Sequence, residues 1–190
     1  MFEHLCHINP DCDREVMKSV VTLAVELARE GREGHRVGAV FMVGDEDRVL
    51  ALSRPLILDP LYGHDPSLRQ IHDPNLRETL KELALLDGAF VISAQGLAVS
   101  ACRYLNASAE GLEISLGLGA RHVAASATTR ATKAMAVVIS ESGVVRIFFK
   151  GELVAEILPE LWLLSREMSH LDGPVEDREY AGVRVFTRRD

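Results

Sequence analysis

Residues 37–43 have the sequence VGAVFMV, a short run without a charged side chain. An apolar, valine-rich run of this length between turn residues is typical of a buried strand. Residues 134–140, AMAVVIS, form a second such run. The two runs predict a sheet of buried strands at the centre of the fold. Further strands are expected over residues 88–93, 96–101, 144–149, 153–157 and 183–187.

Helical patterns surround these strands. Apolar residues at i, i+4, i+7 and i+11 from Val16 to Leu27 predict a helix over residues 13–30, which Gly31 would end. Asn75 to Glu78 resemble a capping box at the start of another helix. That helix is expected over residues 75–86, and two further helices over residues 120–132 and 158–169.

Three stretches are expected to be less regular. Residues 44–47, GDED, predict a hairpin turn, with residues 48–52 as the returning strand. Residues 53–74 contain Pro55, Pro60, Pro66 and Pro74, which indicates a long loop with a short helix inside it. The acidic residues 172–179 are expected to form a solvated loop.

Helices at both ends of a run of strands and hairpins predict an α/β fold. At 190 residues a single domain is the expected organisation. We expect one domain over residues 1–190, with a central mixed β-sheet flanked by helices. Residues 16–157 would form its core, and residues 158–190 a C-terminal helix and tail.

Composition excludes several classes of protein. No apolar run approaches 18 residues, and no secretory signal opens the chain, so we expect a cytoplasmic protein with no membrane partner. The net charge of −7 argues against nucleic acid as a partner. Three cysteines without a signal peptide indicate a reducing compartment. His4, Cys6, His7 and Cys12 match no standard zinc spacing and are expected to lie at a loose terminus.

Asp87 lies at a predicted corner between a helix and a strand, in the sequence LDGAF. A carboxylate there could bind a hard cation or accept a proton. The alternative is an aspartate that satisfies the backbone of its own turn.

Two glycines, Gly117 and Gly119, precede the predicted helix that contains Arg121 and His122. Glycines at a helix start let backbone N–H groups approach an anion, and the helix dipole favours negative charge there. The segment therefore suggests a phosphate cradle, the alternative being a capped structural helix. It lacks the third glycine of the dinucleotide fingerprint, and the chain contains no P-loop motif.

Ser140 and Glu141 end the second apolar strand, where ligands often collect in α/β sheets, although taken in isolation a polar hairpin turn is the simpler interpretation. Cys102 is a weaker candidate, as a nucleophile with His122 as its base; a buried cysteine is the simpler interpretation. A metal site in the proline-rich loop is another weak candidate, and its four polar residues are more simply interpreted as solvated side chains. These loop residues are His64, Asp65, His72 and Asp73.

Four short motifs follow one another along the chain. They are Asp87-Gly88-Ala89, Ala101-Cys102-Arg103-Tyr104-Leu105, Gly119-Ala120-Arg121-His122 and Ser140-Glu141. In order and spacing they resemble the DGA, AGRYL, GTRHR and Ser-Glu motifs of the diadenylate cyclase domain. The resemblance extends over about residues 16–157 and suggests a standalone soluble form of that domain.

The resemblance implies an enzyme that condenses two ATP molecules into cyclic di-AMP and releases two pyrophosphates, with Mg²⁺ or Mn²⁺ as cofactor. Each protomer would hold one ATP. A 3′-hydroxyl of one ATP would attack the α-phosphate of the other in line, across a face-to-face homodimer or within a higher homo-oligomer.

The resemblance also implies roles for particular residues. Asp87, Arg121 and His122 would be catalytic, and Asp87 and Glu141 would bind the metal. Tyr104 would stack on adenine. The residues implied to bind ATP are Gly88, Ala89, Tyr104, Leu105, Gly119, Ala120, Arg121, His122 and Ser140.

The chain departs from the GTRHR motif at two positions, where Ala120 replaces threonine and Val123 replaces the second arginine. These departures favour one alternative, a nucleotide-binding regulatory module of the same fold without turnover. A second alternative is a metal-dependent phosphohydrolase that uses Asp87, Glu141 and His122. A third is a structural or interaction domain that binds no ATP.

Overall fold

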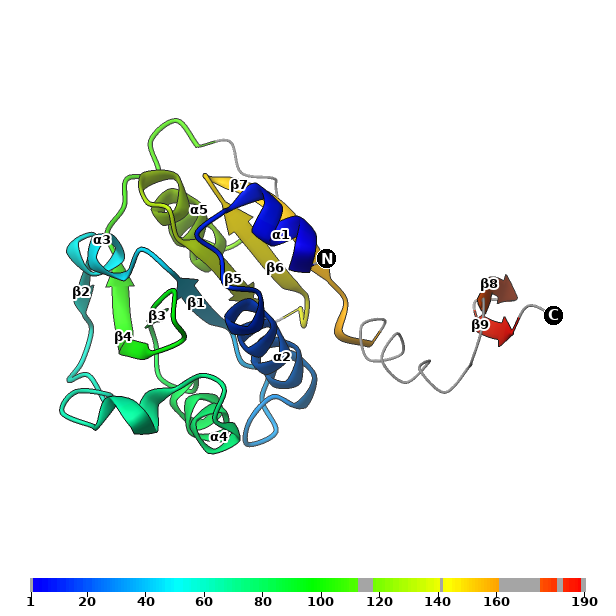
Figure 1. The fold of residues 1–190 in the computed structure, drawn as a ribbon, viewed down its shortest axis with the longest axis horizontal. Coiled ribbons are helices and arrows are strands. Elements are labelled where there is room, and N and C mark those ends of the chain that lie inside the picture. Colours follow the sequence, from blue (N-terminus) through cyan, green and yellow to red (C-terminus); the bar gives the residue numbers. More distant parts are fainter. Residues whose placement is uncertain (1, 113–117, 141, 161–174, 181–182, 189–190) are drawn as a thin grey trace.

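A computed structural model of the 190-residue chain describes residues 2–112, 118–140, 142–160, 175–180 and 183–188 (Figure 1). Its centre is a seven-stranded sheet with the strand order β2-β4-β3-β1-β5-β6-β7. β1 and β3 are parallel, and every other neighbouring pair in this sheet is antiparallel. The mixed sheet expected from the sequence is therefore confirmed. Its strands are β1 (Ala39–Val43), β2 (Ser53–Pro55), β3 (Ala89–Ile92), β4 (Ala98–Leu105), β5 (Met135–Ile139), β6 (Val145–Phe149) and β7 (Glu152–Ile157).

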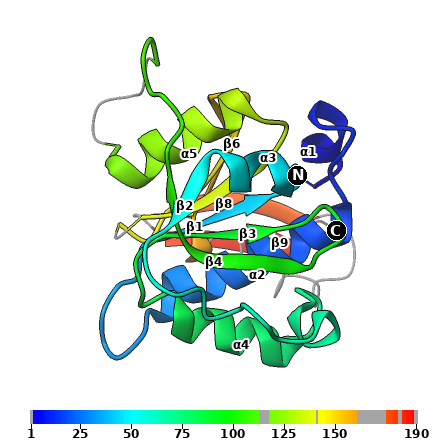
Figure 2. The ribbon, with the colours of Figure 1, turned by 90° about the vertical axis from the view of Figure 1, so that its left-hand side faces the viewer.

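Helices cover both faces of the sheet. Figure 2 shows α2 and α4 on one side of the strands and α3 and α5 on the other. The helices are α1 (Phe2–Ile8), α2 (Arg14–Glu30), α3 (Glu46–Ala51), α4 (Pro74–Leu83) and α5 (Ala120–Ala131), with a 3₁₀ turn η1 (Pro66–Arg69) in the long loop. The α2 face and the α5 face are the names used below for the two sides.

Helix α2 begins and ends where the sequence predicts. The carboxylate of Asp13 accepts hydrogen bonds from the backbone N–H groups of Glu15 (2.9 Å) and Val16 (3.0 Å), which caps the first turn. Gly31 ends the helix at a φ of +60°, a conformation that glycine adopts without strain.

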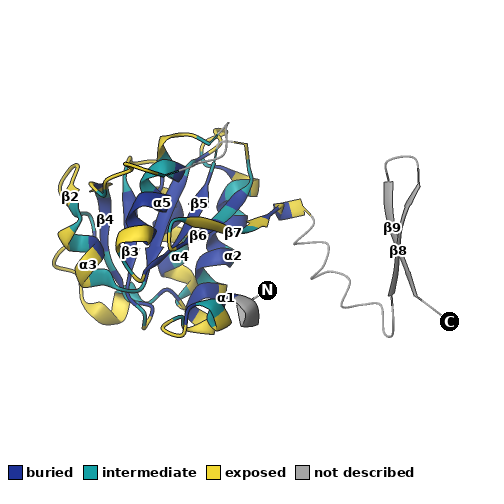
Figure 3. Cartoon of the chain, turned by 90° about the horizontal axis from the view of Figure 1, so that it is seen from above, coloured by how far each residue is buried: buried dark blue, intermediate teal, exposed yellow. Residues whose placement is uncertain are grey.

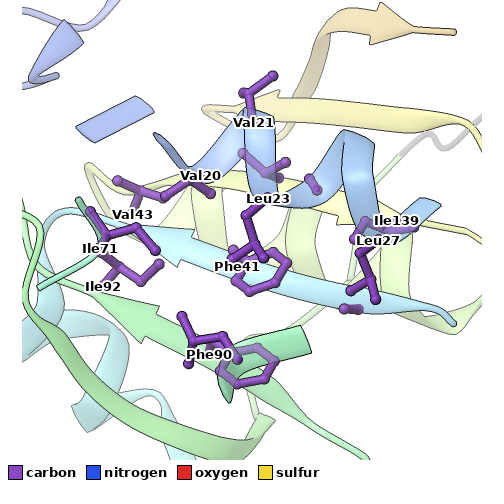
Figure 4. Close-up of a cluster of buried hydrophobic side chains, with 14 of the residues drawn as sticks. Val20, Val21, Leu23, Leu27, Phe41, Val43, Ile71, Phe90, Ile92 and Ile139 are labelled. Atoms are coloured by element: carbon purple, nitrogen blue, oxygen red, sulfur yellow. The ribbon is translucent and has the colours of Figure 1, made fainter. Parts of the chain in front are cut away.

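The core consists of two layers, because alternate residues of each strand point to opposite faces. Phe41 and Phe90 stack on the α2 face with ring centroids 4.9 Å apart, and Leu23 of α2 lies over Phe41 (Figure 4). Their neighbours Val40 and Ala89 belong to the smaller cluster on the α5 face. Figure 3 shows the buried residues concentrated in the sheet and the inner sides of its helices.

The expected strand over residues 48–52 is wrong, because these residues belong mainly to helix α3. Gly44 and Asp45 have φ values of +80° and +46°, so the chain turns sharply after β1. The carboxylate of Asp45 fixes this turn by accepting a 2.7 Å hydrogen bond from the backbone N–H of Lys133. Val49 is then buried on the α5 face, and this tertiary contact favours the helix.

The capping box predicted at Asn75 to Glu78 is also wrong, because α4 begins earlier. The helix begins at Pro74, and its cap is Asp73, whose carboxylate accepts a hydrogen bond from the N–H of Asn75 (2.9 Å). The helix ends at Leu83, three residues before the predicted end.

The expected loop over residues 172–179 is wrong in part. Residues Val175–Tyr180 form strand β8, which pairs with the correctly predicted strand β9 (Val183–Arg188) in a separate two-stranded sheet. Polar residues are compatible with such a ribbon, because an antiparallel pair can remain open to water. The helix predicted over residues 158–169 lies, after Glu160, outside the described residues.

Candidate functional site

The sheet topology brings two of the predicted motifs, those of Asp87 and Ser140, to one edge of the sheet together with Gly38. β1 and β3 run in parallel with Val40 opposite Ala89, so Gly38 and Asp87 both precede their strands at the same edge. β5 runs antiparallel to β1 with Ile139 opposite Ala39, so Ser140 leaves the sheet at that edge too. Sequence spacing alone did not show this meeting, which depends on the strand order.

The same residues also share a face. Val40, Ala89 and Val138 all belong to the cluster on the α5 face. Positions two residues along a strand point to the same side. Contacts place Gly38, Asp87 and Ser140 towards α5: Asp87 and Gly38 lie against Arg121 in its first turn, and Ser140 lies near Arg146, which reaches His122 of the same turn.

Arg121 and Asp87 meet at this edge. The Arg121 Nη2 atom lies 3.6 Å from Asp87 Oδ1, and their side chains are 41% and 89% exposed. Both groups are therefore accessible to a ligand.

Gly38 makes room for Arg121. A Cβ atom at Gly38 would lie only 2.7 Å from Arg121 Nη1 and 3.0 Å from its Cζ, so the guanidinium rests against the bare backbone of residue 38. Sequence reasoning gave Gly38 no role in the site. The available signal was a glycine inside a buried strand segment, which often marks a close approach.

Gly88 is required by the packing of β3 against β4. Its φ is +111°, and a Cβ atom there would lie 2.6 Å from the carbonyl carbon of Cys102. Cys102 itself has a φ of +54°, beside an irregularity in the β3–β4 pairing. Ala89 is buried. Binding of ATP by Gly88 and Ala89 remains a prediction.

Among the described residues, the N-terminus of α5 is open. Gly119 is the N-cap, no side chain caps it, and a Cβ atom there would meet nothing within 4 Å. Gly119 and Ala120 are exposed, whereas Gly117 lies outside the described residues. The N–H groups of a helix start and the helix dipole favour an anion at such a position.

His122 is buried, with 4% of its surface exposed. Its Nε2 atom lies 3.4 Å from Nη1 of Arg146 on β6, and its ring packs edge-on against Phe148. Burial lowers the pKa of His122, and the charge of Arg146 lowers it further. The imidazole is therefore neutral at pH 7. Sequence reasoning missed Arg146, because nothing local to β6 distinguishes it from a surface arginine.

Tyr104 and Leu105 are neighbours on β4 and so lie on opposite sides of the sheet. Leu105 belongs to the cluster on the α5 face. The ring of Tyr104 is partnered across β2 and β4 by Arg54, whose guanidinium carbon lies 4.8 Å from the ring centroid. Stacking of adenine on Tyr104 remains a prediction.

Ser140 hydrogen-bonds the neighbouring turn, with its Oγ atom 2.5 Å from Ser142 Oγ. The same Oγ atom lies 3.4 Å from Arg146 Nη1. Glu141, the second predicted metal ligand, lies outside the described residues.

Cys102 lies apart from His122. It belongs to the cluster on the α2 face, where burial raises the pKa of its thiol and nearby Asp59 raises it further. A protonated, buried thiol is a poor nucleophile. The structure thus supports the structural interpretation of Cys102.

Three of the four polar candidates in the long loop make structural contacts. The carboxylates of Asp65 and Asp73 cap η1 and α4. The Nδ1 atom of His72 lies 3.0 Å from Ser19 Oγ.

The N-terminal segment is helical from residue 2 to residue 8, and is not the loose end expected from the sequence. The Sγ atoms of Cys6 and Cys12 lie 3.1 Å apart. The pKa of Cys12 is raised to about 12, mainly by burial and then by the neighbouring Cys6. Two features are absent from the described part of the chain. In it, no three His, Cys, Asp or Glu side chains are grouped to hold a metal ion.

The same described residues also contain no helix long and apolar enough to cross a membrane.

Comparison with known proteins identifies two curated relatives. The diadenylate cyclase of Methanocaldococcus jannaschii is 44% identical over 152 residues, which cover 80% of this chain and 48% of that protein. The diadenylate cyclase of Haloferax volcanii is 48% identical over 155 residues, covering 81% of this chain and 56% of that protein. The chain thus spans about half the length of these curated relatives.

A crystal structure of a hypothetical membrane spanning protein from Bacillus cereus shares the fold, with a TM-score of 0.55 and 23% identity. The match covers 73% of this chain and 62% of that one. Residues 26–153 match the family model described as DAC, DisA bacterial checkpoint controller nucleotide-binding. This match contains Gly38, Asp87, Arg121 and Ser140, and the chain belongs to the DAC family.

Proposed function

We propose that this protein is a diadenylate cyclase, which converts two ATP molecules into cyclic di-AMP and two pyrophosphates. The observation that carries the proposal is the meeting of Asp87, Arg121 and the open start of α5 at one edge of the sheet. The names of the two relatives support the same reaction. Residues 16–157 would form the catalytic unit.

The reaction needs positioning and charge neutralisation more than covalent catalysis. The first turn of α5 and Arg121 would hold the triphosphate, because both present N–H donors and positive potential to it. Asp87 is exposed beside Arg121 and would accept the proton of an attacking 3′-hydroxyl. The new bond joins this 3′-oxygen to the α-phosphorus of the other ATP, and pyrophosphate leaves.

The residues present fit Mg²⁺ or Mn²⁺ as the cofactor. Mg²⁺ is usually held by one or two carboxylates together with substrate phosphates, so the protein need not supply a full set of ligands. Asp87 offers one accessible carboxylate at the site, and Glu141 is the second proposed ligand. The ion would neutralise charge on the phosphates as they react.

Each protomer would supply half of the reaction centre, so two protomers would have to meet with their sheet edges face to face. Specific activity is then expected to fall on dilution below the dimer dissociation constant. Constant specific activity through a demonstrated dimer-to-monomer transition would contradict this arrangement.

The test is incubation of the purified chain with ATP and either Mg²⁺ or Mn²⁺, with products identified by chromatography and mass spectrometry. We expect cyclic di-AMP, and we expect Asp87→Asn to lower its rate of formation at least about 100-fold. Asp47→Asn is the matched control, because it removes the same charge from an exposed position on α3.

Two other outcomes would assign a different function. ATP binding without product would favour the regulatory module, with Ala120 and Val123 as the first residues to restore to threonine and arginine. Release of AMP or inorganic phosphate in place of cyclic di-AMP would favour a phosphohydrolase.

A further inference from the structure

Arg146 is the one charged residue of strand β6. Its strand neighbours Val145 and Ile147 lie in the core of the α2 face, and Phe148 lies in the cluster of the α5 face. Alternation along the strand therefore places Arg146 on the α5 face, the side on which the candidate site lies.

One end of the Arg146 guanidinium is fixed. Its Nε atom donates a 2.6 Å hydrogen bond to Oε1 of Glu156, which lies directly opposite on β7. Charge-assisted bonds of this length are strong and directional. Because the Arg146 side chain is only 17% exposed, this bond and the surrounding strands determine where the rest of the group points.

The other end reaches the candidate site. Arg146 Nη1 lies 3.4 Å from Ser140 Oγ and 3.4 Å from His122 Nε2. Both distances are longer than the 2.7–3.2 Å typical of good N–H···O bonds. Ser140 and His122 are thus weak hydrogen-bond acceptors for the Arg146 cation. An anion at this point would be a better acceptor.

The electrostatics at this point favour an anion. Arg146 helps to lower the pKa of His122, so the imidazole is neutral and does not compete with Arg146 as a cation. The Nδ1 atom of His122 is buried without a hydrogen-bond partner in the described structure. A phosphate beside Ser140 would therefore meet the guanidinium of Arg146 rather than a charged histidine.

We propose that Arg146 binds the phosphate chain of the nucleotide beside Ser140, and the pyrophosphate that leaves, while Glu156 orients its guanidinium. This inference rests on the proposed function. In this chain Val123 replaces the second arginine of the α5 motif, so the motif supplies only Arg121. Arg146, from a distant strand, would supply a second guanidinium to the site. An arginine suits this role, since its planar fork remains charged and pairs with phosphate through two N–H groups.

The decisive measurement is binding of magnesium pyrophosphate by calorimetry, which does not depend on turnover. Arg146→Met keeps an unbranched stem of similar shape and removes the charge. We expect it to raise the dissociation constant for pyrophosphate by about 10-fold to 100-fold, the usual effect of losing a hydrogen bond to a charged group. The KM for ATP should rise in parallel.

Two further variants separate phosphate binding from a structural role. Arg146→Lys keeps the charge and should recover part of the affinity. Glu156→Gln keeps Arg146 but removes the charge that orients its guanidinium, and should weaken pyrophosphate binding about threefold. Arg29→Met is the matched control, because it removes an exposed arginine from α2 and should leave binding unchanged. Thermal unfolding confirms that each variant is folded.

The outcomes distinguish this inference from the proposed function. Suppose that the unmodified chain makes cyclic di-AMP, and that the folded Arg146→Met variant binds pyrophosphate as tightly as the unmodified chain. The proposed role of Arg146 would then be wrong, and the proposed function would remain supported. If the unmodified chain makes no cyclic di-AMP but binds pyrophosphate in an Arg146-dependent way, the function is wrong and the phosphate site stands. Should Arg146→Met fail to fold, unchanged binding in both Arg146→Lys and Glu156→Gln would overturn the inference.

Discussion

The two faces of the sheet are built from different kinds of side chain. On the α2 face, large residues such as Leu23, Phe41 and Phe90 are almost completely buried. On the α5 face, the helix contributes small buried residues, including Ala125 and Ser126.

Hydrogen bonds supplement the packing on the α5 face. The Ser126 hydroxyl donates a 2.6 Å bond to the carbonyl oxygen of Gly151, and the N–H of Gly151 donates a 3.2 Å bond to Thr129 Oγ1. Small side chains and specific hydrogen bonds fix α5 close to the sheet, with its first turn at the candidate site. The comparison suggests that the α2 face supplies most of the stability, whereas the α5 face positions the residues of the candidate site.

The largest effect on stability is expected from Leu23→Ala. Removing this side chain from the α2 face leaves a cavity and should lower the free energy of unfolding by about 4 kcal/mol. ATP affinity of the folded variant should not change. Ser126→Ala on the α5 face should cost only about 1 kcal/mol, the value of a typical hydrogen bond. Urea unfolding measures both, and equal losses would contradict the proposed division between the faces.

The next effect is expected from Gly88→Ala. The new Cβ atom would collide with the backbone of Cys102, at a φ that alanine adopts only with strain, and should cost about 3 kcal/mol. Gly119→Ala is the control, because no described residue beyond its chain neighbours lies within 4 Å of a Cβ atom there and its φ is −82°. It should cost less than about 1 kcal/mol. Similar thermal unfolding of the two variants would show that the β3–β4 contact tolerates a side chain.

A smaller effect, on activity rather than stability, is expected from Gly38→Ala. The added methyl group would displace the flexible end of Arg121 and should lower kcat/KM for ATP about 5-fold to 10-fold, or about 1 kcal/mol. The same substitution should have no further effect in an Arg121→Ala background, because the group that it displaces is gone. Additive losses in that double-mutant cycle would mean that Gly38 acts in another way.

The smallest effect concerns pH. The pKa of His122 is lowered in the folded protein, so below about pH 6.5 the unfolded chain binds more protons than the folded one. The contribution of His122 to stability is therefore complete above pH 6.5 and is lost as the pH falls towards its lowered folded pKa. We expect the unfolding free energy of the unmodified chain to fall more steeply than that of His122→Gln between pH 7.5 and 5. Parallel curves would show that folding does not lower the pKa of His122.

Much of the α2 face could be predicted from the sequence. The helix from Arg14 to Glu30 follows from its periodicity and from the cap at Asp13, both of which are local features. The strands β1 and β5 follow from apolar runs that only a buried position explains. Helix α3 was missed, because the turn before it is held by distant Lys133 and the burial of Val49 is a tertiary contact.

The candidate site was predicted only in part. Asp87 and Arg121 were identified through the resemblance of short motifs, and the structure places them 3.6 Å apart. Gly38 and Arg146 were not identified as site residues, because a glycine in an apolar run is only a weak signal and Arg146 has no local signal at all. The contact of Gly38 with Arg121 and that of Arg146 with His122 each join a strand to a helix distant in sequence.

By itself the sequence determined which segments are helices or buried strands in most of the chain, since periodicity, caps and turn residues act over a few neighbours. It also determined which polar motifs interrupt the apolar runs. Only the tertiary structure decided that β1 pairs with both β3 and β5, and that their ends meet at the start of α5. Strand order and register depend on the packing of the whole core, and this packing gives Arg121 and Arg146 their partners.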